Sequence, residues 1–426
     1  MTWDFETEPD FQHKIDWAAE FVREKVEPLD VLFPLAMYQP PTAEMRRVVD
    51  PLKQEVREQG LWAAHLGPEL GGEGYGQLKL ALLNEQLGRS PWAPRVFGTA
   101  APDTGNAEII AHYGTEAQRE RYLQPLLEGD IVSCYAMTEQ HGGNDPGSFV
   151  TRAERDGDDW VINGEKFFAS NARYAAFFIL MAVTSPENMP HHGMSMFLIP
   201  ADTPGIVIDR NFDTPGEPPE DASHGLVSFH DVRVPADALL GGEGQAFVIA
   251  QTRLGGGRVH HAMRIVGLAQ RGLDAICERA LSRTTRGKTL ASFQFVQGDI
   301  ADAYIQLESL RLMVMQTAWK IDRYNDYNRV RKDIAAVKVL GPRVLTEIGR
   351  IAINVHGALG ITSDVPFTQM YLGGATLALT DGSSEVHKVT LAQQLLRDYE
   401  PAEGRWPSEY IPDRLERARK QYGVTG

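Results

Sequence analysis

The chain is poor in cysteine. Cys134 and Cys277 are the only two among 426 residues, and they lie far apart. A disulfide framework needs several paired cysteines and a structural zinc site needs closely spaced ones, so the sequence predicts neither. We expect no metal site and a reducing, cytoplasmic setting.

Long apolar runs are also missing. The longest, Ala175 to Val183, is too short to cross a bilayer. The first residues, from Met1 to Glu6, lack the basic start and apolar core of a signal peptide. We therefore expect no membrane insertion.

Positive charge is in deficit. The chain has 42 Lys and Arg against 57 Asp and Glu, which gives a net charge of −15. An acidic surface argues against nucleic acid or anionic lipid as the main partner. It leaves room for a small basic patch that binds phosphates.

Apolar residues, at 43% of the chain, suffice for two or three packed domains. Their spacing is helical over most of residues 11–130, as at Phe11, Ile15 and Ala18, and again from Gly244 onward. Between them lie short segments rich in β-branched and aromatic residues. We predict an α+β fold with an N-terminal helical domain (1–130), a middle antiparallel β-domain (131–242), a C-terminal four-helix bundle (243–404) and a charged surface tail (405–426).

Glycine-containing pairs and runs mark the expected turns. Asp156-Gly157 and Asn163-Gly164 are typical of tight turns between strands. We interpret the glycines of 241–244 and 255–257 as turn residues, because the sequence lacks a Walker A pattern, a Gly-x-Ser-x-Gly motif and a dinucleotide fingerprint.

Two candidate clusters fall in the β-domain. Tyr135-Ala-Met-Thr-Glu-Gln-His-Gly-Gly-Asn-Asp145 follows a predicted strand, and its amides and hydroxyl could meet a polar heterocycle and a phosphate; a β-bulge and loop explain it equally well. Phe167 and Phe168 face opposite ways in a strand, so one can pack inside while the other covers a flat ring. Ser170 shares the face of Phe168, although an ordinary hydrophobic strand is the simpler interpretation.

Two more clusters fall in the helical part. Arg283-Thr-Thr-Arg-Gly-Lys288 suits a pyrophosphate, or it places cations at a helix C-terminus before a glycine stop. Asn354-Val-His-Gly-Ala-Leu-Gly360 permits close backbone approach to a ligand. Asp381, in Thr380-Asp-Gly-Ser-Ser384, is either the cap of the helix that follows or a catalytic base.

In their order and spacing, these clusters resemble the acyl-CoA dehydrogenase family from about residue 10 to residue 400. The strongest matches are Met137-Thr-Glu139, Val161-Ile-Asn-Gly-Glu-Lys166, Val266-Gly-Leu-Ala-Gln-Arg271, Arg283-x-x-x-Gly-Lys288, Val355-His-Gly-Ala-Leu-Gly360 and the Asp381-Gly-Ser-Ser loop. The stretch Arg253-Leu-Gly-Gly-Gly-Arg-Val-His-His261 is most similar to the branch that includes human family members ten and eleven.

The resemblance implies an FAD enzyme, a homotetramer or dimer, that acts on acyl-CoA and passes electrons to an electron-transfer flavoprotein. Asp381 would be the base, and Asn144, Arg258 and Gly382 would meet the substrate. The implied cofactor residues are Tyr135, Met137, Thr138, Gly143, Asn144, Phe168, Ser170, Arg283, Thr285, Gln294, Val355, His356, Gly357, Ser383 and Glu385. Of these, Arg283, Thr285, Gln294 and the loop 355–357 would reach the FAD of a neighbouring subunit.

Several positions depart from the family pattern. Most members have Glu where this chain has Asp381, so the carboxylate arm is shorter by roughly 1.5 Å, one carbon–carbon bond. Members that carry the base on an earlier helix have it at the position of Gly257, which leaves no alternative base there. Asn144 replaces a usual serine, and Gly255 replaces an acidic residue found in many members.

The predicted reaction is removal of the proton α to the thioester carbonyl by Asp381, in a pocket we expect to be apolar, while the β-hydride passes to flavin N5. The product would be the trans-2-enoyl-CoA. A flavin-dependent oxidase of the nitroalkane type is an alternative, and Arg258 opposes it. A non-catalytic flavoprotein binding module is another, and the net charge and the retained Asp381 oppose it.

Overall fold

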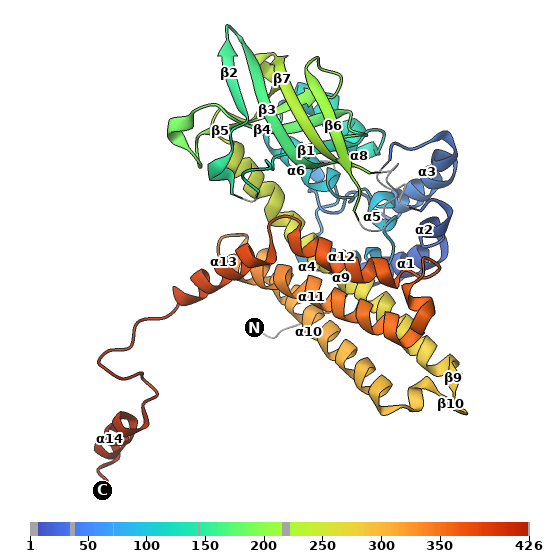
Figure 1. Ribbon diagram of the computed structural model, residues 1–426, viewed down its shortest axis with the longest axis vertical. Helices are drawn as coiled ribbons and strands as arrows, with labels where there is room; N and C mark the ends of the chain where they lie inside the picture. Colours follow the sequence, from blue (N-terminus) through green and yellow to red (C-terminus); the bar gives the residue numbers. More distant parts are fainter. Residues whose placement is uncertain (1–6, 35–38, 71, 144, 215–221, 425–426) are drawn as a thin grey trace.

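The computed structural model describes residues 7–34, 39–70, 72–143, 145–214 and 222–424. A β-sheet lies at one end of the molecule and a layer of long helices at the other, with shorter N-terminal helices beside both (Figure 1). The expected order of helices, strands and helices is confirmed.

The N-terminal part is helical, as the apolar spacing predicts. Phe11, Ile15 and Ala18 form the buried face of the first helix. Thr115 caps α7 in a capping box with Gln118. The helices are α1 (Pro9–Phe21), α2 (Leu29–Leu32), α3 (Ala43–Glu58), α4 (Gln77–Leu87), α5 (Ala93–Val96), α6 (Asp103–Tyr113), α7 (Glu116–Gln118) and α8 (Gln124–Glu128), with π-helical turns at Val22–Val26 and Arg119–Leu123.

The middle part is one sheet with strand order β6-β7-β3-β2-β4-β5-β8. Its pairs are antiparallel except that β1 lies parallel to β4, and β2 meets β4 in a single parallel pair. The strands are β1 (Ser133–Ala136), β2 (Arg152–Asp156), β3 (Asp159–Ser170), β4 (Phe177–Val183), β5 (Met194–Pro200), β6 (Ile206–Phe212), β7 (His224–Val234) and β8 (Leu239–Leu240).

One of the two predicted turns in the sheet is wrong. Asp156-Gly157 lies in the hairpin between β2 and β3, as expected. Asn163-Gly164 instead lies inside the continuous strand β3, where the pairing with β7 shifts register. A Cβ on Gly164 would lie 2.6 Å from the Cα of Thr151, so the glycine serves close backbone approach at a bulge.

The C-terminal part consists of long helices packed side by side. They are α9 (Ala246–Ser282), α10 (Gln294–Tyr324), α11 (Arg331–His356), α12 (Phe367–Leu379) and α13 (Ser384–Leu396), with a small hairpin of β9 (Thr284–Thr285) and β10 (Lys288–Thr289) after α9. The bundle is confirmed, but α12, which packs on α11, was not predicted. The glycines of 241–244 form a turn, whereas those of 255–257 lie inside α9, so that turn prediction is wrong.

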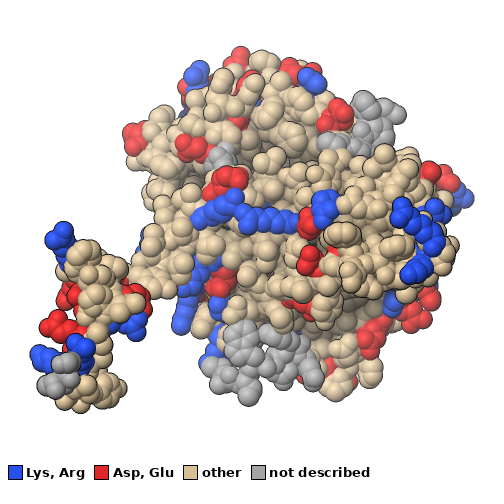
Figure 2. All heavy atoms as spheres, turned by 60° about the horizontal axis from the view of Figure 1, so that its bottom comes forward, with Lys and Arg blue, Asp and Glu red and all other residues tan. Residues whose placement is uncertain are grey.

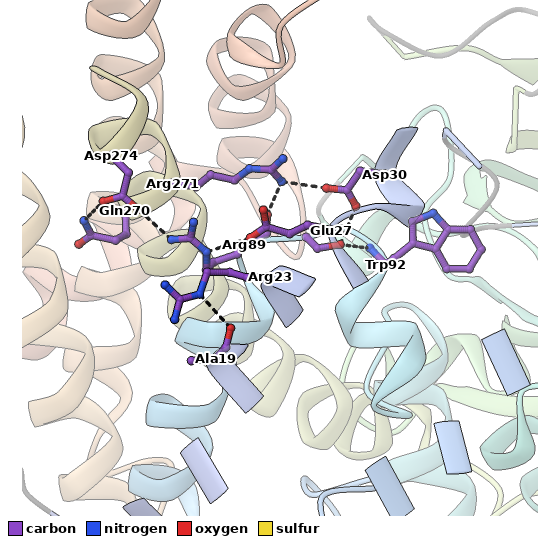
Figure 3. A network of polar contacts seen from close by, with 10 residues as sticks. Ala19, Arg23, Glu27, Asp30, Arg89, Trp92, Gln270, Arg271 and Asp274 are labelled. Carbon is purple, nitrogen blue, oxygen red and sulfur yellow. Dashed lines mark hydrogen bonds and ion pairs between the residues drawn. The ribbon is translucent and has the colours of Figure 1, made fainter. Parts of the chain in front are cut away.

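Polar contacts fix α9 against the N-terminal helices (Figure 3). The Arg89 side chain lies 3.0 Å from Glu27 and 2.9 Å from Asp274 of α9. Arg271 of α9 lies 2.8 Å from Asp30 and donates a hydrogen bond to the backbone carbonyl of Arg89. These contacts hold the position of the helix that carries most of the site described below.

The chain leaves the bundle after α13 and projects away from it, ending in the short helix α14 (Ile411–Tyr422) (Figure 1). This segment is exposed, as expected for the charged tail. No helix in the described part of the chain is both long enough and apolar enough to cross a membrane.

Candidate active site

Asp381 lies in the turn between α12 and α13, in a left-handed conformation with φ of 55°. Such a φ is costly for a residue with a side chain and is held by its surroundings. The Nε–H of Arg258 donates to the Asp381 carbonyl oxygen over 3.1 Å, and His387 Nε2 lies 3.3 Å from the same oxygen. The next residue, Gly382, has φ of 98°, and a Cβ there would lie 3.1 Å from His387 Nε2.

The two interpretations of Asp381 are separated by this geometry. Ser383, not Asp381, occupies the N-cap position of α13, and its side chain makes no capping hydrogen bond in the described structure. The Asp381 carboxylate points instead to α9, where Oδ1 lies 3.8 Å from Arg253 Nη1 and Oδ2 lies 3.4 Å from His261 Nε2. Asp381 is therefore free of a capping role.

One face of α9 forms the floor beneath this carboxylate. Arg253, Gly257 and His261 are spaced by four residues, so they lie above one another on the helix. A Cβ on Gly257 would lie 3.3 Å from Asp381 Oδ2. The glycine leaves room for the carboxylate, whose side chain is 14% exposed.

The surroundings of Asp381 are cationic, so the expected apolar pocket is wrong. Burial lowers the pKa of Lys338 to about 8. The positive charge of Arg258 also lowers this pKa, whereas the negative charge of Asp381 raises it. Lys338 donates to the backbone carbonyl of Leu377 over 2.6 Å. Burial also lowers the pKa of His261, which Asp381 opposes, so the imidazole is neutral at neutral pH.

A second carboxylate, from another helix, lies against α9 at Gly256, the residue before Gly257. A Cβ on Gly256 would lie 3.3 Å from Glu108 Oε2, a residue of α6. Burial raises the pKa of Glu108 to about 7, an effect that Arg253 opposes. Glu108 is thus a second group in this region whose protonation changes near neutral pH.

Arg253 connects Asp381 with β1. Its guanidinium lies 3.9 Å from the centroid of the Tyr135 ring, and its Nε donates to Asn106 Oδ1 over 2.8 Å. The Tyr135 hydroxyl is buried and has no hydrogen-bond partner among the described residues. Burial raises the pKa of Tyr135 to about 12. An orphaned hydroxyl of this kind is suited to a bound ligand.

The residues after β1 are anchored by a buried ion pair. Lys166 Nζ lies 2.7 Å from Glu139 Oε1 and donates to the Met137 carbonyl over 2.9 Å. The Glu139 carboxylate accepts from the backbone N–H groups of Val150 and Thr151. This fixes the backbone on both sides of Thr138, whose carbonyl accepts from Phe167 N–H.

Phe168 and Ser170 both contact His224 at the end of β3, where the pairing with β7 shifts register. Phe168 is 44% exposed, has φ of 56° and stacks on His224 with ring centroids 4.5 Å apart. Ser170 Oγ lies 2.9 Å from His224 Nδ1. Phe167 and Phe168 both lie against Phe212, with ring centroids 5.3 Å and 6.3 Å away, so the expectation that they face opposite ways is wrong. The strand thus presents an exposed flat ring beside a hydroxyl.

Of the remaining residues expected here, Gly143 has φ of 53°, and a Cβ on it would have no neighbour within 4 Å among the described residues. Asn144 lies outside the described residues. Ser383 and Glu385 begin α13 directly after Asp381, and Glu385 is exposed.

The other predicted cofactor residues lie elsewhere. Arg283, Thr285 and Gln294 are near the β9–β10 hairpin, at the far end of α9 from the sheet (Figure 1). The 25 residues of helix between Arg258 and Arg283 span roughly 38 Å. Val355, His356 and Gly357 end α11 beside Arg279, in that same region. Within one chain the structure brings neither group to Asp381.

Arg283 is the C-cap residue of α9, and its backbone N–H donates to the Arg279 carbonyl. The interpretation as a cation at a helix C-terminus therefore holds for Arg283. Lys288 lies in the exposed hairpin beyond the helix end.

Three sequence models match the chain in order: "Acyl-CoA dehydrogenase, N-terminal domain" at residues 10–130, "middle domain" at 134–232 and "C-terminal domain" at 244–396. The chain belongs to the acyl-CoA dehydrogenase family. It is 39% identical to acyl-CoA dehydrogenase family member 11 of Mus musculus, over 82% of this chain and 45% of that protein. It is also 39% identical to Mycobacterium tuberculosis FadE2, over 81% and 85%. The chain thus spans about half the length of the vertebrate relatives.

Solved structures of acyl-CoA dehydrogenases have the same fold. One from Mycobacterium abscessus has a TM-score of 0.84 at 37% identity, and butyryl-CoA dehydrogenase of Megasphaera elsdenii has a TM-score of 0.77 at 26%. Each match covers 93% of this chain and 100% of the other. A further neighbour is described as an FAD-dependent dehydrogenase, with a TM-score of 0.78 at 25% identity.

The residues present fit FAD, the cofactor of this acyl-CoA dehydrogenase fold. Phe168 and Ser170 offer a flat ring and a hydroxyl, and the Tyr135 hydroxyl has no partner within the part of the chain that the structure describes. Sequence reasoning missed Arg253, His261, Lys338 and Glu108 as site residues. The i, i+4, i+8 spacing of Arg253, Gly257 and His261 was the available signal. It was missed because the glycines of 255–257 were interpreted as a turn rather than as part of a helix.

Proposed function

We propose that the protein catalyses α,β-dehydrogenation of an acyl-CoA thioester, with Asp381 as the base that takes the α-proton. The observation that carries this is the Asp381 carboxylate, held between Arg253 and His261 without a capping role. The product would be the trans-2-enoyl-CoA. Bound FAD would supply the acceptor for the hydride that leaves the β-carbon.

The neighbouring residues have distinct tasks in this proposal. Arg258 and His387 hold the carbonyl of Asp381, and with it the left-handed turn, so the backbone N–H of Asp381 stays fixed relative to the substrate carbonyl. Gly257 leaves the carboxylate room to move toward the α-carbon. Such freedom compensates for an arm one methylene shorter than glutamate.

Glu108 is the alternative base within the same site. Its pKa of about 7 suits a general base, and it lies across Gly256 from the Asp381 side of α9. Asp381 is favoured because it is close in the chain to Ser383 and Glu385, two of the residues expected to bind the cofactor. Glu108 lies on α6, away from them in the chain.

The test is anaerobic titration of the purified flavoprotein with acyl-CoAs of different chain length. We expect one or more thioesters to bleach the oxidised flavin band, and Asp381→Asn to slow bleaching by roughly 10²–10⁴-fold. Glu108→Gln is the matched carboxylate control and should keep most of the rate. A bleaching rate that survives in Asp381→Asn but is lost in Glu108→Gln would transfer the role to Glu108.

We further infer that the partners are a second copy of this chain and an electron-transfer flavoprotein, in a cytoplasmic setting without nucleic acid. Reoxidation of the bleached enzyme distinguishes the acceptors. Fast reoxidation by the flavoprotein and slow reoxidation by oxygen support the dehydrogenase. Rapid turnover of nitroalkanes with oxygen, without bleaching by thioesters, would favour the oxidase instead.

A further inference from the structure

Residues 400–424, here called the projecting arm, stand clear of the rest of the molecule (Figures 1 and 2). The chain is last tied to the bundle by Asp398, whose carboxylate lies 2.5 Å from Lys332 Nζ. Within the described residues, the hydrogen bonds, ion pairs and ring contacts of the arm join only residues of the arm. Trp406 stacks on Tyr410, and Arg417 donates to the carbonyl of Ser408.

The arm lies beyond the part of the chain that the family shares. The match to the family's C-terminal domain ends at residue 396. The two solved structures cited above are matched over their full lengths but cover 93% of this chain. The arm thus lies outside the residues matched to the family's C-terminal domain.

The helix of the arm, α14, is amphipathic. Ile411, Leu415, Ala418 and Tyr422 recur at helical spacing and form one stripe, in which Ile411 and Tyr422 are each 74% exposed. A helix of 12 residues is marginal in water unless its apolar face packs on something. The stripe therefore requires a surface that the chain's own bundle does not provide.

Charge favours a second copy of this chain as that surface. Four Arg and Lys against two Asp and Glu give α14 a net charge of +2, so the rest of the chain carries −17. The acidic body of a second copy attracts the cationic helix. An anionic membrane or nucleic acid would repel the acidic body to which the helix is attached. Each copy has both an arm and an acidic body, so reciprocal exchange of arms would satisfy both copies at once.

The body also carries exposed apolar side chains. Tyr304, Ile305 and Leu312 lie on α10, and Val386 and Val389 lie on α13. Extended at about 3.4 Å per residue, the segment between Asp398 and α14 can span roughly 40 Å, enough to cross onto a neighbouring chain. We propose that the projecting arm docks through its apolar stripe on the body of a second copy of this chain.

The first test identifies what the stripe contacts. A photoreactive benzoylphenylalanine replaces Leu415 in the full-length flavoprotein, and the same probe at Arg417 on the polar face is the control. Irradiation should give covalent dimers on a denaturing gel from position 415 and few from position 417. Products that are only internally cross-linked monomers would overturn the proposal.

The second test measures what docking contributes. Ile411→Ser with Leu415→Ser, and a chain ended after Glu400, should raise the concentration at which the assembly dissociates by at least about tenfold in light scattering. Gln421→Ser is the matched control and should leave it unchanged. Equal dissociation of the full and shortened chains would overturn the proposal. So would arm-dependent sedimentation with vesicles of phosphatidylglycerol, which would identify a lipid surface as the occupant. Flavin content and bleaching at high concentration should persist in all variants, so failure here is distinct from failure of the proposed reaction.

Discussion

Gly257 lies directly beneath the carboxylate of Asp381, such that a methyl group on Gly257 would come to 3.3 Å from Asp381 Oδ2. That separation is tighter than an ordinary van der Waals contact. The absence of a side chain at position 257 is therefore part of the proposed base's environment, although the two residues are 124 positions apart in sequence.

Gly257→Ala should slow flavin bleaching by about 10–100-fold, because the added methyl group displaces the carboxylate from its reactive position. Stopped-flow bleaching measures this. Gly298→Ala, in α10 with open space around it, is the matched control and should leave the rate unchanged and stabilise the helix slightly. Equal rates in the two variants would show that the contact does not limit Asp381.

A carboxylate moved to position 257 should replace Asp381 in part. In Asp381→Ala, bleaching should be nearly abolished, and adding Gly257→Glu should recover at least about tenfold of the loss, since that side chain starts beside the vacated position. Gly257→Gln in the same background is the control. Recovery with Gln as well as Glu would rule out base catalysis as its cause.

Glu108 should make stability depend on pH. Its folded pKa of about 7 is above the ordinary value of 4.5, so the native state holds a proton that the unfolded chain releases between those values. Stability from this group is present below about pH 4.5 and is lost as pH rises through about 7. Glu108→Gln should remove the loss and stabilise the protein at pH 8 by about 1–2 kcal/mol relative to wild type. Thermal unfolding from pH 5 to pH 8 measures this, with exposed Glu120→Gln as the control. A wild-type deficit that does not grow with pH would contradict it.

Lys166→Met should destabilise the β-domain by about 3–5 kcal/mol, because it leaves the buried Glu139 carboxylate without its counter-ion. Denaturant unfolding measures the loss, and flavin content should fall with it, since Lys166 also holds the Met137 carbonyl. Lys25→Met breaks an exposed ion pair with Glu55 and should cost less than about 1 kcal/mol. Similar losses in the two variants would argue against a special role for the buried pair.

Mixed assemblies should show whether Arg283 serves a neighbouring chain. Asp381→Asn and Arg283→Glu should each be inactive alone, but co-expressed chains with different tags should regain activity. In such a hybrid, one site combines an intact Asp381 from one chain with an intact Arg283 from the other. Turnover of the doubly purified hybrid measures this, and a hybrid as inactive as its parents would place Arg283 outside the neighbour's site.

Local patterns in the sequence predict the order of the elements, because periodicity is a local property. They do not predict the irregular backbone at Phe168, where the pairing of β3 with β7 shifts register. The surroundings of Asp381 depend on α9, α11 and α12 coming together, and α12 was not recognised as a helix. The glycines of 255–257 favour a turn by their own propensity, but packing keeps them helical. The Lys166–Glu139 pair joins β3 to the segment after β1, so spacing along the chain gives no sign of it.

The 37-residue helix α9 has a consequence for how the enzyme behaves in solution. One end of it carries the partners of Asp381, and the other end leads to Arg283, which would complete the site of a different molecule. A monomer would then contain two incomplete sites and no complete site. Diluting the protein would abolish turnover without unfolding the helices. The rate per chain would rise with protein concentration until assembly was complete.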